Sequence, residues 1–343
     1  MRSSRASGVA IVAALVLASC SVSSGPADPS PSPTATQPPE SAAVLFVQQT
    51  PLGGVLMSGP PDGRGAVALL PPGTSGGTDF AASADGSVIA YTSAVVLPAG
   101  SSGYTSWVAD HGVARPVALA PTSVGPVTSW TVSADGRAAY VAVGNSLQRY
   151  DVRTHTLTTL CATCVPAAFG DARREVAVSP DERTVAESTV QGSRFYGGQS
   201  VTDVTVVDVA SGGKLWHHGE RGFPQVLAWT FADDDTLITT SDSMQGQSVP
   251  EVHRVSGFRT SRVTDTATGV HGYGPFSFVD GVWWYSRDNP SKPAVTTIYV
   301  NPDLTPSGER VLAVRPVGPG SSSYTPVTSE PGPITVPAAS PSS

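Results

Sequence analysis

A short stretch decides the fold: SADGRAAYVAV, residues 133–143, in which a turn leads into an apolar strand. Asp135 and Gly136 favour a tight hairpin, because glycine reaches positive φ at little cost and the aspartate side chain can bond its own turn. Related copies begin at Ser83, Ser133, Ser179, Phe231 and Phe278, which are 50, 46, 52 and 47 residues apart. Their turn residues are Asp85, Gly86, Asp135, Gly136, Asp181, Asp233, Asp280 and Gly281.

Each period of the repeat holds about four short apolar segments, and no long stretch has the 3.6-residue period of a helix. Four antiparallel strands repeated around an axis are typical of β-propeller blades. The sequence therefore predicts an all-β fold, a single β-propeller over residues 42–329. Six four-stranded blades of about 48 residues fit this length best, and five or seven remain open.

The Ser/Phe-x-Asp-Gly signature with its following strand resembles the repeats of TolB-like propellers and their WD-repeat-like bacterial relatives. This resemblance covers nearly all of the folded region and implies a propeller architecture. The Gly-His and Trp-Asp dipeptides of eukaryotic WD repeats are absent from the sequence. The resemblance therefore implies a fold rather than a particular activity.

The first twenty residues have the three parts of a bacterial export signal. Arg2 and Arg5 precede an uncharged, mostly apolar segment at residues 8–17, which is too short to span a bilayer as a helix. The sequence LASC at residues 17–20 resembles the lipobox of bacterial lipoproteins. This resemblance implies removal of a signal peptide, residues 1–19, and lipidation of Cys20. The alternative is ordinary secretion with an incidental cysteine.

Two segments of biased composition flank the predicted propeller. Residues 20–41 are rich in proline, serine and threonine, and we expect a disordered tether. Residues 330–343 have a similar composition, and we expect a disordered tail. The protein is thus predicted to be lipid-anchored to the cell membrane on its extracytoplasmic side. Only two lysines beside abundant alanine, glycine, proline and valine make the composition look actinobacterial.

Charge and composition exclude several classes of protein. The chain of 343 residues has 35 glycines, 31 prolines and 14% charged residues, which argues against a helical bundle or coiled coil. Its net charge of −7 argues against a nucleic-acid partner. Loss of two arginines with the signal peptide would make this −9, so membrane attachment would depend on the lipid. We expect a monomer that binds an envelope protein or a small ligand.

Candidate chemical sites are few. Cys161 and Cys164 remain once Cys20 is lipidated, and in an oxidising compartment we expect a structural disulfide; a redox or metal site is the alternative. The six histidines lack the spacing of a His-Glu-x-x-His zinc site. We expect the acidic run at residues 233–235 to form a solvated turn rather than a cation site. No catalytic residue, cofactor or metal is predicted.

Six tryptophans fall on predicted strands or at their ends, and we expect them to pack between blades. Trp283 and Trp284 are adjacent, so they point to opposite faces of a strand, and one of them could line an exposed face as a ligand platform. The sequence as a whole predicts a non-enzymatic binding or scaffold module of the cell envelope. The alternative is an envelope hydrolase or lyase with its site at the mouth of the propeller channel.

Overall fold

The computed structural model describes parts of the chain between residues 43 and 336. The described residues are 43–50, 53–61, 64–70, 75–96, 102–119, 130–165, 176–190, 202–218, 225–242, 248–255, 277–279, 282–289, 292–302, 307–316 and 322–336. All of them belong to one compact unit, Thr36–Ser343. The predicted signal peptide, the lipidated Cys20 and the tether lie outside the described residues.

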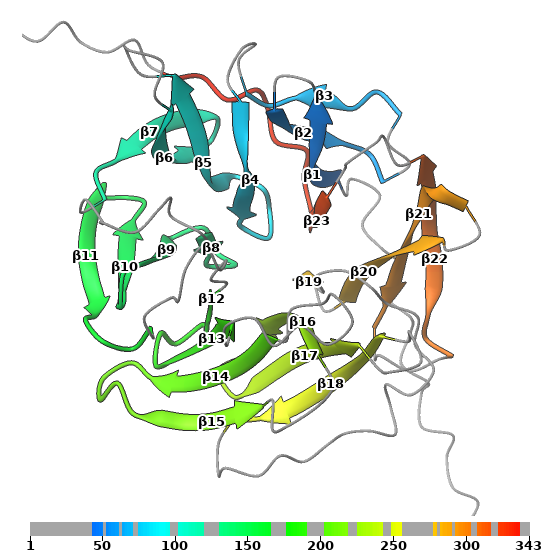
Figure 1. Ribbon diagram of the computed structural model, residues 1–343. Coiled ribbons are helices and arrows are strands. Elements are labelled where there is room, and N and C mark those ends of the chain that lie inside the picture. The colour runs from blue at the N-terminus through cyan, green and yellow to red at the C-terminus, as the bar shows by residue number, and fades with distance from the viewer. Residues whose placement is uncertain are drawn as a thin grey trace, which may run out of the picture. The chain divides into compact units, whose positions relative to one another are not determined.

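Small antiparallel sheets surround a common axis (Figure 1). We number them by their order in the chain and give their strands from the axis outward. Sheet 1 has β23 (Ser322–Val327), β1 (Ala43–Thr50), β2 (Gly53–Gly59) and β3 (Val67–Ala68). Sheet 2 has β4 (Ser75–Ala82), β5 (Val88–Val96), β6 (Ser102–Asp110) and β7 (Val113–Val117). Sheet 3 has β8 (Trp130–Val132), β9 (Ala138–Val143), β10 (Ser146–Asp151) and β11 (Thr156–Cys161).

The remaining sheets complete a propeller arrangement. Sheet 4 has β12 (Val176–Val178), β13 (Thr184–Val190), β14 (Thr202–Asp208) and β15 (Lys214–His218). Sheet 5 has β16 (Gln225–Phe231), β17 (Thr236–Asp242) and β18 (Ser248–Arg254). Sheet 6 has β19 (Ser277–Val279), β20 (Val282–Asn289), β21 (Lys292–Asn301) and β22 (Arg310–Pro316).

The all-β fold is confirmed, since the described residues include no helix. The described strands form six sheets, of which five have the predicted four strands, while sheet 5 has three described strands. The chain that follows β18, residues 256–276, lies outside the described residues.

The signature turn between β8 and β9 is closed by its own side chains. The Ser133 hydroxyl donates to Asp135 Oδ1 (2.8 Å) and accepts from the N–H of Ala138 (3.0 Å). The N–H of Arg137 also donates to Asp135 Oδ1 (3.1 Å). Gly136 has φ +69°, a value that favours glycine. The turn thus forms because serine, aspartate and glycine each satisfy one of its local requirements.

The same bonds hold the turns of the two neighbouring sheets. Ser83 donates to Asp85 Oδ1 (2.6 Å), and Ser179 donates to Asp181 Oδ1 (2.7 Å). In the turn of sheet 4, Glu182 takes the place of the glycine and adopts φ +61°. A carboxylate side chain therefore stands where the other two copies have no side chain.

The fourth copy of the signature forms a shorter turn than the sequence predicts. The N–H of Ala232 donates to the carbonyl of Thr236 (2.9 Å), which spans one residue fewer than the equivalent bonds of the first three copies. Asp233 accepts from the N–H (2.7 Å) and hydroxyl (2.9 Å) of Thr236. In the fifth copy, Asp280 and Gly281 lie outside the described residues.

Each described turn also contacts the neighbouring sheet. The N–H of Ala84 donates to the carbonyl of Ala134 in the next turn (3.0 Å). A Cβ added to Gly136 would lie 3.1 Å from Val88 Cγ2, which is shorter than an ordinary van der Waals contact. Glycine at this position therefore serves both the positive φ and the close approach of two sheets.

Buried apolar side chains fill the interfaces between neighbouring sheets. Between sheets 2 and 3, Val88 and Ala139 belong to one buried cluster with Trp130. The indole N–H of Trp130 donates to the Thr92 hydroxyl across the interface (3.0 Å). The buried apolar residues are thus divided among the interfaces between sheets. Each sheet therefore needs a neighbouring sheet to cover the apolar side chains on its packed face.

Trp283 and Trp284 are both buried, on opposite faces of β20. Trp283 packs in a cluster with Ile238 of sheet 5, and Trp284 packs with Val44 of sheet 1. The alternative that one of them lines an exposed face is therefore wrong. Both faces of this strand meet a neighbouring sheet, which adjacent sequence positions alone do not reveal.

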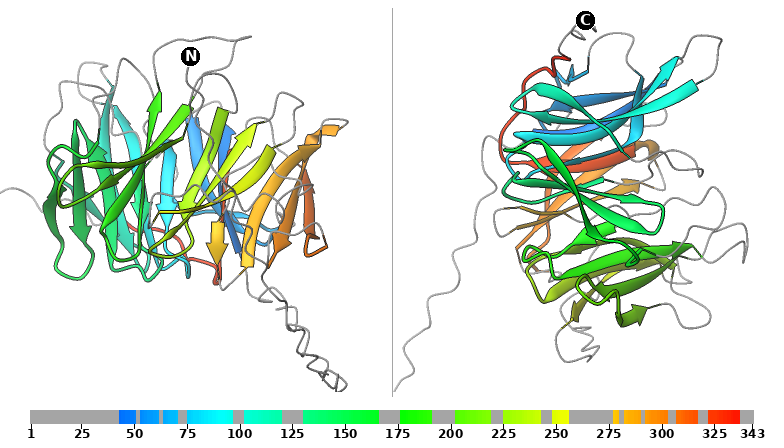
Figure 2. Two further views of the ribbon diagram at one scale, coloured as in Figure 1. Left: turned by 90° about the horizontal axis from the view of Figure 1, so that it is seen from below. Right: turned by 90° about the vertical axis from the view of Figure 1, so that its left-hand side faces the viewer.

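The C-terminal strand closes the ring. β23 pairs antiparallel with β1, so the last described strand is the innermost strand of the first sheet. Beyond it, the N–H of Thr328 donates to the carbonyl of Ala84 in sheet 2 (2.8 Å). Figure 2 shows this C-terminal segment, coloured red, beside the blue and cyan strands of the first two sheets.

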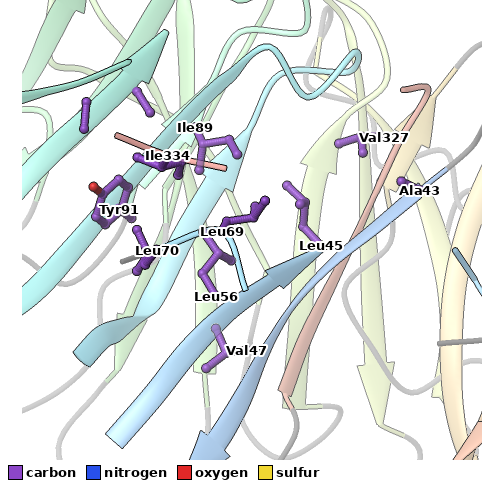
Figure 3. Close-up of a cluster of buried hydrophobic side chains, with 12 residues drawn as sticks. Ala43, Leu45, Val47, Leu56, Leu69, Leu70, Ile89, Tyr91, Val327 and Ile334 are labelled. Atoms are coloured by element: carbon purple, nitrogen blue, oxygen red, sulfur yellow. The ribbon is translucent and has the colours of Figure 1, made fainter. Parts of the chain in front are cut away.

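The residues after β23 continue across sheets 1 and 2. The N–H of Ile334 donates to the carbonyl of Leu69, and the N–H of Thr335 donates to that of Gly112 (both 2.7 Å). Ile334 is only 3% exposed and lies in a buried cluster with Leu69 and Tyr91 (Figure 3). Most of residues 330–336 are exposed, as expected of a solvated segment, but the expectation did not include the burial of Ile334.

Shortening Ile334 to alanine should destabilise the propeller. Ile334→Ala removes a buried side chain between two sheets, and we expect the free energy of unfolding to fall by about 2–4 kcal/mol. Val336→Ala is the matched control, because Val336 is 38% exposed, and we expect a change below about 0.5 kcal/mol. Urea unfolding measures both. Equal losses in the two variants would show that the segment does not close the core.

Gly136 and Gly144 both have positive φ, but only Gly136 lies close to a neighbouring sheet. Comparing alanine substitutions at the two positions therefore distinguishes the cost of backbone strain from the cost of disturbing the contact between sheets. A Cβ at Gly144 (φ +59°) meets open space, whereas a Cβ at Gly136 meets Val88. We expect Gly144→Ala to cost about 1 kcal/mol from backbone strain and Gly136→Ala about 2–3 kcal/mol. Thermal and urea unfolding compare the variants. A Gly136→Ala loss no larger than that of Gly144→Ala would contradict tight docking of the turn.

Candidate functional site

A cavity of about 410 Å³ lies among the inner strands, where these strands run into the signature turns. The inner strands β4, β8, β12, β16 and β23 contribute to its wall, with Tyr140 from β9 behind them. These strands surround the axis in Figure 1. The cavity therefore depends on all of these sheets being held together in one ring.

Three threonines occupy equivalent places in this wall. Thr131 pairs with Tyr140, Thr230 with Ile238 and Thr325 with Leu45, and each partner packs toward the next sheet. The three threonines are half-buried, and the described part of the chain provides no hydrogen-bond partner for their hydroxyls. Three inner strands thus contribute threonines with unpartnered hydroxyls to the lining of the cavity.

The other inner strands have small residues at the same register position. Ala81 of β4 pairs with Ala90, and Ala177 of β12 pairs with Ala186. In β19, Ser277 occupies this position. At this register position, the wall therefore has small apolar side chains at the two alanines and polar side chains at the three threonines.

The signature serines also line the cavity, but their protons are already used. Ser83, Ser133 and Ser179 each donate to the aspartate of their own turn and accept from a backbone N–H. Since a hydroxyl has a single proton to donate, these serines stabilise their turns and have little left for a ligand. The threonines are the better candidates for ligand contacts.

Asp135 is the carboxylate in the described wall of the cavity. Partial burial works to raise its pKa, but hydrogen bonds from Ser133 and from the N–H of Arg137, with the Arg137 charge, leave the pKa lower than its usual value. Arg137 Nε lies 3.2 Å from Asp135 Oδ2. The carboxylate is therefore ionised and already has a cation beside it.

Tyr140 connects the cavity wall to a charged network. Its hydroxyl donates to Glu182 Oε1 (2.6 Å), and Arg149 Nε donates to the same oxygen (2.8 Å). Arg149 Nη1 also lies 3.2 Å from Asp151 Oδ2. Burial raises the pKa of Tyr140, and the bond to Glu182 raises it further. The Tyr140 proton is thus held toward Glu182, and its oxygen is left as an acceptor.

The sequence did not identify this network. The first two copies of the signature have glycine at the position of Glu182. This difference between the copies is the sequence feature that could have indicated the network. Arg149 and Tyr140 lie in sheet 3, whereas Glu182 lies in the turn of sheet 4. Only the packing of the two sheets brings them together.

Cys161 and Cys164 are both buried and both carry free thiols. They pack in the apolar cluster between sheets 3 and 4 with Val165 and Val176. Burial raises the pKa of the Cys164 thiol, and its neighbour Cys161 raises it further. The expected disulfide is not formed in this structure.

The described residues hold neither a cluster of metal ligands nor a membrane-spanning helix. No group of three or more histidine, cysteine, aspartate or glutamate side chains is arranged to hold a metal ion among them. Nor do these residues contain a helix with the length and apolar character needed to cross a membrane.

No protein-family model matches the chain, and no curated protein matches it either. Among solved structures, the nidogen/laminin complex is similar at 13% identity and a TM-score of 0.45, covering 80% of this chain and 97% of that chain. The tricorn protease is similar at 13% identity and a TM-score of 0.44, covering 80% of this chain and 31% of that one. At these scores the similarities carry no argument about function, and the fold assignment rests on the strand pairing of this chain.

Dipeptidyl peptidase 4 of Porphyromonas gingivalis is similar at 12% identity and a TM-score of 0.40. The match covers 76% of this chain and 44% of that one. This chain thus corresponds to less than half of either peptidase, and neither similarity transfers an activity to it.

Proposed function

We propose that this protein is a non-enzymatic binding module of the bacterial cell envelope, and that its axial cavity holds a small ligand or a short segment of a partner. A lipid on Cys20 would anchor it to the extracytoplasmic side of the membrane. The observation that carries the proposal is the cavity wall, in which Thr131, Thr230 and Thr325 present unpartnered hydroxyls from equivalent places on three inner strands.

The size and rigidity of the cavity support ligand binding. Its volume of about 410 Å³ lies within the usual range of ligand pockets. Its wall consists of strands whose sheets pack against neighbours, and the signature turns at their ends are closed by hydrogen bonds. A wall that is already ordered loses little conformational entropy when a ligand binds.

Filling the cavity should abolish binding without unfolding the protein. Ala134 lines the cavity, its side chain is exposed, and only its backbone carbonyl takes part in the contact with Ala84. We expect Ala134→Trp to occupy the cavity while the free energy of unfolding changes by less than about 1 kcal/mol. Ala210→Trp, at an exposed turn of sheet 4, is the matched control.

Ligand-observed NMR tests this with a library of cationic, anionic, neutral polar and apolar small molecules and short peptides. The mature chain in detergent should show binders that are lost in Ala134→Trp and kept in Ala210→Trp. The absence of any binder sensitive to Ala134→Trp would overturn the proposal. Conversion of a bound compound into product would instead support the alternative of an envelope hydrolase or lyase.

Mass spectrometry tests the anchor. We expect the N-terminal peptide of the mature protein to begin at Cys20 and to carry a diacylglyceryl group. Cys20→Ala should remove both the modification and cleavage after residue 19, because the thiol is the group that is acylated. Ser19→Ala keeps a small residue and should leave processing intact. A mature chain that begins elsewhere, or an unmodified Cys20, would contradict the anchor.

A further inference from the structure

We infer that the ligand of the axial cavity is an uncharged, polyhydroxylated molecule, a neutral saccharide unit. This inference rests on the proposed function, since it assigns a chemical class to the occupant of the same cavity. Four properties of the wall support it: its charge, its free hydroxyls, the acceptor oxygen of Tyr140, and its apolar residues.

The charge of the wall favours a neutral ligand. Among the described lining residues there is no lysine, arginine or histidine, so an anion would enter without a cation to compensate it. The carboxylate of Asp135 already has Arg137 beside it at 3.2 Å, so a cation would find no unpaired partner there. Moving a charge out of water without compensation is costly, whereas a neutral ligand avoids that cost.

The hydroxyls require a ligand with several polar groups. Thr131, Thr230 and Thr325 stand on different strands around the axis, and their hydroxyls have no partner among the described residues. An apolar ligand would remove water from these hydroxyls without replacing its hydrogen bonds. A molecule with hydroxyls pointing in several directions can both donate to and accept from each threonine.

Tyr140 adds a directional requirement. Its proton is held by Glu182 at 2.6 Å, so toward any other group the Tyr140 oxygen acts as an acceptor. A ligand that contacts this oxygen must therefore offer a donor. A saccharide hydroxyl provides that donor without adding a charge.

The apolar part of the wall fits the C–H faces of a sugar ring. Phe80 and Phe231 are half-buried residues of the wall, and they come from β4 and β16. Pro180 and Pro326 add further apolar surface. A sugar ring has apolar C–H faces and a polar rim, so it matches a wall that contains both aromatic and proline residues and threonines.

The test measures binding of named probes to the mature chain in detergent by isothermal titration. The neutral probes are cellobiose and N,N′-diacetylchitobiose. Their comparison compounds are cellobiouronic acid, in which a carboxylate replaces a hydroxymethyl group, glucosamine as a cation, and the capped peptide acetyl-Ala-Thr-Ala-Thr-amide. We expect at least one neutral disaccharide to bind at least tenfold more tightly than each comparison compound, and its binding to be lost in Ala134→Trp.

Threonine-to-valine variants then locate the contacts. Thr131→Val, Thr230→Val and Thr325→Val remove one hydroxyl each and nearly keep the side-chain volume. We expect each to weaken binding of the neutral disaccharide by about five- to tenfold, the effect of one lost hydrogen bond. Thr159→Val is the matched control, because Thr159 is exposed on the outer strand β11, and its affinity should be unchanged. If one of the three valine variants does not unfold cooperatively, the affinities of the other two valine variants decide the test.

The outcomes separate this inference from the proposed function. If a charged compound or the peptide binds best and Ala134→Trp abolishes that binding, the saccharide assignment is overturned and the cavity remains a binding site. If a disaccharide binds but the three valine variants bind as the Thr159→Val control does, the assignment is also overturned. If no probe or library compound is sensitive to Ala134→Trp, both proposals fail.

Discussion

The structure depends on closure of the ring, because each sheet buries its apolar residues only against the sheets beside it. β23 provides this closure by pairing with β1, so residues from the two ends of the chain form one sheet. The following residues strengthen the same junction, with Ile334 buried between sheets 1 and 2. If the ring were open, the sheets at its two ends would each have one apolar face exposed to water. The free energy gained by burying the apolar side chains of those faces would then be lost.

The cavity is a consequence of the same closure. Its wall is made of inner strands from several sheets, and no single sheet contributes most of the described lining residues. The signature turns define the strand ends at one side of the ring, and the contact between Ala84 and Ala134 sets the spacing of two neighbouring turns. The three threonines therefore line a common space, although successive ones are about 100 residues apart in the chain.

Sequence reasoning succeeded where the structure is local. The Asp-Gly turns around Asp85 and Asp135 form through bonds between residues at most five positions apart, so their pattern is visible in the sequence. It was less successful with sheet 5, where the signature is degenerate and the turn is one residue shorter. Ile334 was missed because the proline-rich composition around it concealed one apolar residue whose partners lie in distant parts of the chain.

The repeat, the hairpin turns and the all-β class follow from the amino-acid sequence, since these features depend on backbone preferences and contacts between near neighbours. Tertiary structure alone decided which strand closes the ring, that Trp283 and Trp284 are both buried, and that Glu182 meets Tyr140 and Arg149. It also decided which threonines line the axial cavity. The physical reason is that these features arise from packing between sheets, and a turn motif carries no information about the surface that its neighbour presents.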